Sequence, residues 1–249
     1  MSTSKGAPDG ATDPEAGPLE APATHLDAGL VHRWIAELDR RLRAAEAYLT
    51  ELDAAIGDAD HGTNMTRGAR AALTALAEAA SSEDPASTPT ADAGAGTAGP
   101  ARLVMTVGHS LFRSVGGASG PLYGTWFNAL GRSLPADEDA TPLELAMALG
   151  AALDAVQQLG AAEVGDKTMV DALAPASRQA REVASSGADL AGMLRIAAGA
   201  AEDGAIATIP LRARRGRASY LGARSEGHQD PGATSAAIVL DALRTAAGA

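Results

Sequence analysis

The chain has 249 residues, which is enough for one large domain with a sizeable hydrophobic core. Its formal net charge of −11 argues against a nucleic-acid partner, and the absence of cysteine excludes a disulfide framework, thiolate metal ligands and a cysteine nucleophile. No apolar run approaches the ~20 residues of a membrane span, so we expect a cytoplasmic protein with no membrane partner.

Composition favours an all-α fold. Hydrophobic residues make up 46% of the chain but only 3% are aromatic, so alanine, leucine and valine must fill the core. Alanine has the strongest helix propensity, and apolar residues with a period of two, as in strands, are rare.

Two segments interrupt the helical pattern. Residues 1–24 are rich in Pro, Gly, Ser and Asp and predict a disordered tail, and residues 81–100 have a similar composition and predict a flexible loop. We therefore expect one functional domain over residues 25–249.

Apolar residues at helical spacing predict eight amphipathic helices in the rest of the chain. The fifth should open at Thr141, where Thr-Pro-Leu-Glu forms a capping box, and the seventh should follow Asp189. The other six are expected at about 27–56, 63–80, 101–115, 120–132, 167–185 and 233–247.

Polar residues gather in three connections that have a common design. Residues 57–64 (GDADHGTN), 116–121 (GGASGP) and 228–235 (HQDPGATS) each place glycine and small polar residues before a helix. Backbone N–H groups at a helix N-terminus are unpaired, and the helix dipole there favours an anion. Three such connections in one chain suggest an anionic ligand.

The first connection also carries negative charge, because Asp53, Asp58 and Asp60 lie within eight residues. Mg²⁺ prefers oxygen ligands and commonly binds through a few carboxylates and substrate phosphates. A magnesium nucleotide would therefore explain both the acidic trio and the three helix starts. Helix capping on a solvated face is the simpler alternative for the aspartates.

Other metal sites and phosphate motifs find less support. A calcium loop that began at Asp58 would have Gly62 at its fifth ligand position and Ala69 at its twelfth, so that pattern fails. His61, His109 and His228 are isolated candidates for zinc, and the chain has neither a Walker-type loop nor a G-x-S-x-G elbow. The basic run at residues 212–217 (RARRGR) is a solvated loop in which one arginine could reach a phosphate.

Four blocks together resemble the dihydroxyacetone kinase L subunit, whose family includes the nucleotide-binding C-terminal domain of ATP-dependent dihydroxyacetone kinases. They are residues 56–65 (IGDADHGTNM), 116–127 (GGASGPLYGTWF), 165–175 (GDKTMVDALAP) and 216–235 (GRASYLGARSEGHQDPGATS). The blocks occur in family order. The resemblance implies an antiparallel eight-helix barrel with a nucleotide site at one end.

The resemblance also implies the site residues. The carboxylates of Asp53, Asp58 and Asp60 match those that hold two Mg²⁺ ions on ADP or ATP. The matching nucleotide-binding positions are His61, Gly62, Thr63, Asn64, Ala118, Ser119, Gly160, Met169, Arg217, Asp230, Pro231 and Gly232, and none is expected to act as a nucleophile. Ala59 replaces a glycine of many relatives, which is tolerable if its φ is negative.

The function implied by the resemblance is phosphoryl transfer in an assembled kinase. Mg-ADP would be a retained cofactor that accepts a phosphoryl group from a phosphohistidine on the M subunit of a phosphotransferase system. That group would pass to dihydroxyacetone on a K subunit, so this chain alone should not phosphorylate the ketone. A nucleotide-sensing interaction module, a metal-dependent phosphohydrolase and a subunit of an ATP-dependent triose or tetrulose kinase remain as alternatives, and a homodimer remains open.

Overall fold

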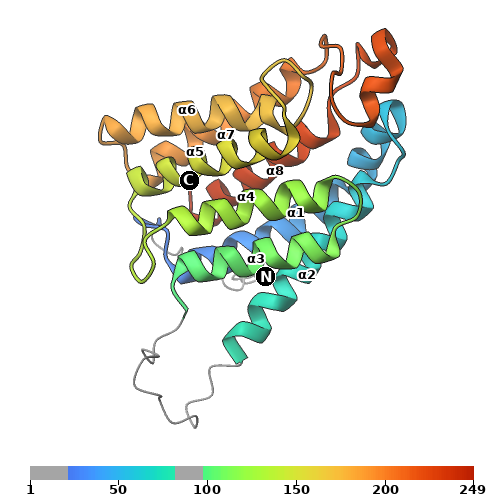
Figure 1. Cartoon of the computed structure of the whole chain (residues 1–249). Helices are drawn as coiled ribbons and strands as arrows, with labels where there is room; N and C mark the ends of the chain where they lie inside the picture. Colours follow the sequence, from blue (N-terminus) through green and yellow to red (C-terminus); the bar gives the residue numbers. More distant parts are fainter. Residues whose placement is uncertain (1–21, 82–97) are drawn as a thin grey trace, which may run out of the picture.

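Helices form almost all of the regular structure in residues 22–81 and 98–249, the part of the chain that the computed structural model describes (Figure 1). The all-α class is confirmed, since the β-type pairing in this part is an isolated bridge between Leu26 and Ala140. The α-helices are α1 (Ala28–Ile56), α2 (His61–Ser81), α3 (Pro100–Ser114), α4 (Ser119–Ser133), α5 (Pro142–Gly160), α6 (Met169–Ser185), α7 (Leu190–Ala207) and α8 (Pro231–Ala246).

The expected tail and loop fall mainly on residues 1–21 and 82–97, which lie outside the described residues. The end of the expected tail is described, and there the backbone N–H of Ala23 donates to Ala247 O at 3.0 Å. The first described residues are therefore tied to the C-terminus of the chain.

Local signals set where the helices begin. The capping box predicted at Thr141 and Glu144 is confirmed, and Asp189 caps α7 as expected by accepting from Gly192 N at 2.7 Å. A second capping box, between Thr168 and Asp171, opens α6. One helical element was missed by sequence analysis, the 3₁₀ segment η1 (Arg217–Ser225), which is kinked at Gly222.

The helices pack in a closed order. Each helix contacts its neighbours in the sequence, from α1 to α8, and α8 packs against α1, which closes the order into a ring. Such a ring is what the expected barrel requires.

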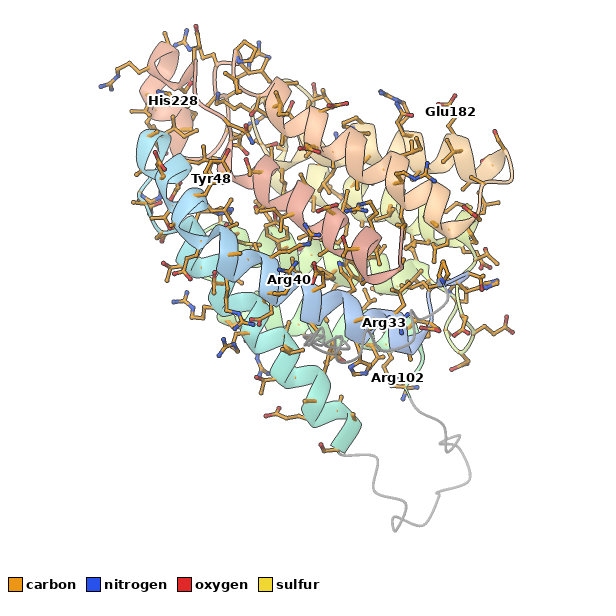
Figure 2. The ribbon with its side chains drawn as sticks, turned by 180° about the vertical axis from the view of Figure 1, so that it is seen from behind. Arg33, Arg40, Tyr48, Arg102, Glu182 and His228 are labelled. Carbon is orange, nitrogen blue, oxygen red and sulfur yellow. The ribbon has the colours of Figure 1, made fainter. Side chains whose placement is uncertain are left out.

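Charged side chains such as Arg40 on α1 and Glu182 on α6 lie on the outside (Figure 2). None of the helices in the described part has the length and apolarity that a membrane span requires.

Three aromatic residues, Trp34, Trp126 and Phe127, meet in the core. Trp34 of α1 lies with its ring centroid 6.4 Å from that of Trp126 and 5.3 Å from that of Phe127, both on α4. The indole N–H of Trp34 donates to Val239 O of α8 at 2.9 Å. Leucine, valine and alanine fill the surrounding space, as the composition predicts, so that α1, α4 and α8 are held in a fixed relation.

Candidate functional site

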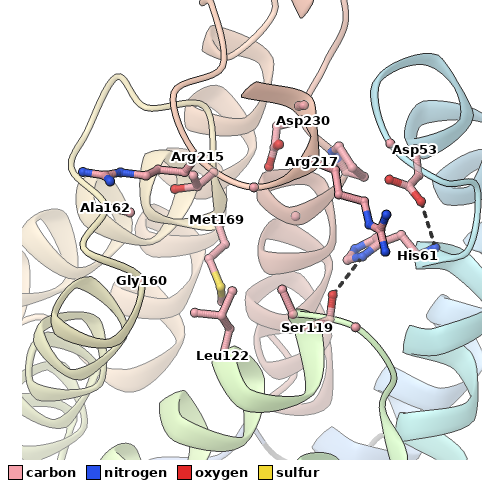
Figure 3. A pocket seen from close by; sticks show the side chains of 18 of the residues that line it. Asp53, His61, Ser119, Leu122, Gly160, Ala162, Met169, Arg215, Arg217 and Asp230 are labelled. Carbon is pink, nitrogen blue, oxygen red and sulfur yellow. Dashed lines mark hydrogen bonds between the residues drawn. The ribbon is translucent and has the colours of Figure 1, made fainter. Parts of the chain in front are cut away.

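A pocket of about 520 Å³ opens at one end of the helices (Figure 3). The C-terminal ends of α1 and α5, the N-terminal ends of α2, α4, α6 and α8, and residues 215–218 line it. A cavity is therefore present at one end of the fold, and its role as a nucleotide site stays a prediction.

The pocket brings four helix N-termini together. Consecutive helices run in opposite directions, so α2, α4, α6 and α8 all begin at this end (Figure 1). Their first residues His61, Ser119, Met169 and Pro231 all line the cavity. The dipoles of these helix starts make this end of the molecule favourable for an anion.

An acidic trio lies beside these helix starts. One carboxylate oxygen each from Asp53, Asp58 and Asp60 can be chosen so that the three lie within 4.8 Å of one another. Asp53 is buried near the end of α1, and its Oδ2 accepts from the backbone N–H of Asp60 at 2.9 Å and of His61 at 3.2 Å. It therefore fixes the start of α2, while all three aspartates offer the oxygen ligands that Mg²⁺ prefers.

The turn between α1 and α2 is tightly constrained. A Cβ atom added at Gly57 would lie 2.0 Å from Asp53 Oδ1, so glycine is required there while Asp53 keeps this position. Ala59 has a φ of 61°, in the left-handed region. The condition under which alanine would be tolerated here without strain, a negative φ, is therefore not met, and the turn holds Ala59 where its Cβ is crowded against the backbone.

An arginine from the opposite side of the pocket meets the acidic trio. Arg217, at the start of η1, places its Nε 3.0 Å from Asp58 Oδ2, and its side chain is 70% exposed. Figure 3 shows this side chain reaching across the pocket toward His61 and Asp53. Arg215 instead donates to Asp166 at 3.2 Å, so the two arginines face different acidic partners.

His61 is the centre of a chain of buried hydrogen bonds. Its Nδ1 lies 3.2 Å from the Ser119 hydroxyl and its Nε2 lies 2.8 Å from the Ser235 hydroxyl. Ser235 in turn lies 2.7 Å from the Tyr123 hydroxyl. Burial lowers the pKa of His61 and raises that of Tyr123, so both groups are neutral near pH 7. The chain joins the starts of α2, α4 and α8 in one network.

The side of the pocket away from the acidic trio is apolar. Leu122 of α4 and Met169 of α6 point toward one another there (Figure 3). Val156, Gly160 and Ala162, from the end of α5 and the turn after it, complete this wall. A flat apolar group fits between such side chains, and a flexible methionine can cover its face.

The turn before α8 supplies the remaining wall. Asp230 caps α8 by accepting from Ala233 N at 2.7 Å, and Pro231 and Gly232 follow it in the first turn. The Asp230 side chain is buried, and this burial raises its pKa to about 7.

Comparison with known proteins assigns the family. The DAK2 domain matches residues 55–245, which is most of the chain. The chain belongs to the DAK2 domain family. The resemblance to the dihydroxyacetone kinase L subunit is thereby confirmed.

Curated relatives of this DAK2 domain are kinase subunits and larger enzymes. The PEP-dependent dihydroxyacetone kinase, ADP-binding subunit DhaL, of Escherichia coli (strain K12) is 39% identical over 214 residues, or 86% of this chain and 94% of the relative. The PTS-dependent ADP-binding subunit DhaL of Lactococcus lactis is 34% identical and covers 84% of this chain and 93% of the relative. The human triokinase/FMN cyclase is 35% identical, but the match spans 91% of this chain and only 37% of that enzyme.

A solved structure also matches. The dihydroxyacetone kinase from C. freundii in complex with AMP-PNP and Mg²⁺ is 25% identical, with a TM-score of 0.61. The match covers 96% of this chain and 38% of that chain. Only part of that kinase therefore corresponds to the DAK2 domain described here.

The DAK2 domain brings most of the residues singled out from the sequence into the pocket. The lining includes Asp53, Asp58, Asp60, His61, Ala118, Ser119, Gly160, Met169, Arg217, Asp230, Pro231 and Gly232. These residues come from six separate segments of the chain. Their role in binding a ligand stays a prediction.

Three of the residues singled out do not line the pocket. Gly62 packs against α1, where an added Cβ would lie 2.1 Å from Glu46 O. Thr63 donates to Glu46 Oε1 at 3.2 Å, and Asn64 Oδ1 accepts from Arg67 at 2.7 Å. These three residues hold the first turn of α2 in place.

The zinc alternative finds no support in the part of the chain that the structure describes. Within residues 22–81 and 98–249, the group of three potential ligands close enough to share an ion is the acidic trio. His61, His109 and His228 are not part of such a group.

Sequence analysis missed several residues at the base of the pocket. Tyr123 and Lys167 line it, and Asp171 Oδ2 accepts from Thr168 N at 2.8 Å. Lys167 was inside a quoted block but was not singled out. The sequence did contain a signal for Lys167, because the chain has only two lysines, Lys5 and Lys167, among 20 basic residues. A lysine retained in an arginine-rich chain indicates a position where arginine does not fit.

Proposed function

We propose that this chain is the nucleotide-binding, phosphoryl-transferring subunit of a dihydroxyacetone kinase and holds Mg-ADP as a retained cofactor. The observation that carries the proposal is the single pocket in which the acidic trio, four helix N-termini and an apolar wall meet. The acidic trio suits Mg²⁺, the helix N-termini suit the phosphates, and the apolar wall suits the base. Relatives named as ADP-binding subunits, which the chain covers nearly end to end, support the same conclusion.

The residues present fit the proposed cofactor. Asp53, Asp58 and Asp60 would hold Mg²⁺, for which we propose two ions, and bound Mg²⁺ would neutralise phosphate charge during transfer. Backbone N–H groups of residues 116–119 would bind phosphate oxygens. Leu122 and Met169 would enclose the base.

In this proposal the chain acts by positioning and charge stabilisation. The helix N-termini and Arg217 would stabilise the negative charge of the group in transit, and no residue of this chain would form a covalent bond to it. The phosphoryl group would come from a phosphohistidine of an M-type subunit and would leave for dihydroxyacetone on a K-type subunit. Transfer to the ketone then requires the partner.

The geometry of His61 disfavours the phosphohydrolase alternative. A hydrolase needs a base that is free to accept a proton from water, and His61 is the histidine that lines the pocket. Both of its ring nitrogens already have hydroxyl partners, Ser119 and Ser235. His61 is therefore better suited to orient Ser119 at the pocket than to activate water.

The proposal is tested by asking what the purified protein carries. Protein purified without added nucleotide is denatured, and the released nucleotide is identified and quantified by chromatography. We expect close to one ADP per chain, because the cofactor is retained through the reaction cycle. Protein that is empty and hydrolyses ATP would overturn the proposal in favour of the phosphohydrolase.

Reconstitution then decides the phosphoryl donor. The chain is combined with K-type and M-type subunits and supplied in parallel with phosphoenolpyruvate plus the general phosphotransferase proteins, or with ATP alone. Dihydroxyacetone phosphate formed only in the first arm is the expected result. Equal turnover with ATP and no M-type subunit would instead favour an ATP-dependent triose kinase, as the similarity to triokinase allows.

A further inference from the structure

Lys167 is a buried cation whose role the pocket chemistry does not explain. It is 1% exposed and lies between the turn after α5 and the start of α6. Its φ is 64°, so the backbone is held in the left-handed region, which is unfavourable for lysine. A buried charge in a strained conformation persists only where its contacts compensate for both costs.

The Lys167 ammonium is surrounded by backbone carbonyl groups. It donates to Thr208 O at 2.8 Å, to Leu211 O at 3.1 Å, to Ile209 O at 3.4 Å and also to His228 O. The first three carbonyls follow the C-terminus of α7, where the helix dipole favours a cation. An ammonium has three protons, so these four acceptors use its full donor capacity.

These contacts bring together the two ends of one chain segment. Residues 208–211 leave α7 and residue 228 precedes α8, and Lys167 lies between them. Two neighbouring bonds join the same ends: Gly227 N donates to Ile209 O at 2.8 Å, and Asp230 N donates to Thr208 Oγ1 at 2.9 Å. Segment 208–230 is therefore a loop that is closed at its base.

The closed loop supplies one wall of the pocket. Residues 215–218 and Asp230 all line the cavity, and Arg217 reaches Asp58 from this loop. Thr168 and Met169, which directly follow Lys167, line the pocket as well. Movement at the base of the loop would displace its tip, which is where the contacts to the acidic trio are made.

We propose that Lys167 is a positioning residue that closes the base of loop 208–230 and thereby holds Arg217 and Asp230 at the nucleotide pocket. The inference rests on the proposed function for its ligand, a nucleoside diphosphate. The ammonium group suits four converging carbonyls because it is a compact point charge, whereas a guanidinium is planar and larger. This explains why a chain with 18 arginines keeps a lysine here.

Replacement by glycine isolates the side chain. Glycine adopts a φ of 64° without strain, so Lys167→Gly removes the ammonium and relieves the backbone at the same time. Lys167→Arg keeps the charge but not the shape. The control for loss of one positive charge is Arg195→Met, at an exposed position on α7 away from the pocket.

Two measurements on the full chain test the proposal. Hydrogen exchange of the nucleotide-free protein reports on residues 212–227, and calorimetric titration with ADP in excess Mg²⁺ reports on the pocket. For Lys167→Gly we expect faster exchange confined to 212–227, cooperative unfolding as in the wild type, and an ADP Kd raised about tenfold or more because buried carbonyls lose their donor. Added n-butylammonium, which replaces the missing side chain, should partly restore both the slow exchange of 212–227 and the ADP affinity. Lys167→Arg should behave like Lys167→Gly. Arg195→Met should behave like the wild type.

Wild-type exchange in 212–227 together with a wild-type Kd in Lys167→Gly would overturn the proposal. Faster exchange throughout the helices, or loss of cooperative unfolding, would also overturn it, because Lys167 would then support the whole fold and not the loop. If the wild type itself does not bind ADP, the proposed function fails. The exchange measurement, made without nucleotide, still decides whether Lys167 closes the loop.

Discussion

Two aspartates of the acidic trio have the same functional group but very different surroundings. Asp53 is buried and accepts from two backbone N–H groups at the start of α2. Asp58 is 37% exposed at its side chain and forms an ion pair with the exposed Arg217. Asp53 therefore contributes to the fold as well as to the proposed metal site, whereas the contribution of Asp58 is limited to the site.

Substitution separates these two roles. Asp58→Asn should weaken binding of Mg-ADP at least about tenfold, since one charged ligand is lost. The same change should leave the stability of the nucleotide-free protein within about 0.5 kcal/mol of the wild type. Asp53→Ala should also weaken binding but cost about 1–2 kcal/mol of stability, because two N–H groups lose their acceptor. Calorimetric titration and urea unfolding measure the two effects.

The contrast between the variants is the control. If Asp58→Asn lowers stability and leaves nucleotide affinity intact, the aspartates are a helix-capping group on a solvated surface. That outcome would remove the basis for the metal site.

The acidic trio could be predicted because its members are close in the sequence, whereas other residues of the site could not. Asp53, Asp58 and Asp60 are separated by a single turn, so their side chains must lie near one another. The partner of His61, Ser235, is 174 residues away, and Lys167 contacts residues more than 40 positions further on. Nothing in a local pattern determines which distant segment faces such a residue.

At the scale of single elements, Asp230 stabilises the start of α8 by capping it, but burial of its carboxylate is unfavourable. Asp230 satisfies Ala233 N, which stabilises the helix, but its carboxylate is buried and is destabilised when ionised. The neighbouring carboxylate of Asp171 raises the Asp230 pKa further, and Lys167 lowers it. The net result is a folded-state pKa of about 7, compared with 3.8 for an ordinary aspartate.

This difference predicts how stability depends on pH. The folded protein binds the proton more tightly than the unfolded chain, so Asp230 lowers stability as the pH rises from about 4 to about 7 and has a constant effect above that range. Asn caps a helix as well as Asp and carries no charge. Asp230→Asn should therefore be more stable than the wild type, by an amount that grows from pH 5 to pH 7 and then levels off.

Urea unfolding of both nucleotide-free proteins at pH 5, 6, 7 and 8 measures the difference. Other titrating groups are shared by the two proteins, so they cancel in the comparison. Parallel stability curves would show that Asp230 is not buried as an ionisable group in solution.

Helix positions follow from sequence more directly than the segments between them. The apolar period of α1 and the capping residues of α5 and α7 predict their starts correctly, because both signals are local. The 3₁₀ segment η1 has no such period. It is fixed by Gly216 and Gly222 at positive φ and by the Ser225 hydroxyl, which accepts from Ala213 N at 2.9 Å.

At the scale of the whole molecule, the alternating direction of the helices creates the site. Most connections between successive helices are short and make neighbours antiparallel, so every second helix begins at the same end. Eight helices in sequence therefore predict that four N-termini share an end. They do not predict that α8 packs against α1, which depends on long-range contacts such as that of Trp34 with Val239.

A ligand in this pocket touches most of the fold, which leads to a prediction about global stability. Six of the eight described α-helices contribute an end to the lining, so unfolding any of them removes part of the binding site. A ligand that binds only the folded state stabilises it by about 2.7 kcal/mol at a hundredfold excess over Kd. We expect Mg-ADP to raise the Tm of nucleotide-free protein by roughly 5–10 °C.

Removing the metal with a chelator, and adding ADP or Mg²⁺ separately, distinguishes their contributions to this shift in Tm. Excess EDTA should lower the Tm to the value measured with ADP alone, because without a cation the acidic trio repels the phosphates. ADP alone and Mg²⁺ alone should each produce a smaller shift than the two together, and Asp58→Asn should lose most of the combined shift. If ADP alone stabilises the protein as well as Mg-ADP does, the helix N-termini and Arg217 suffice for the phosphates, and the acidic trio has a different role.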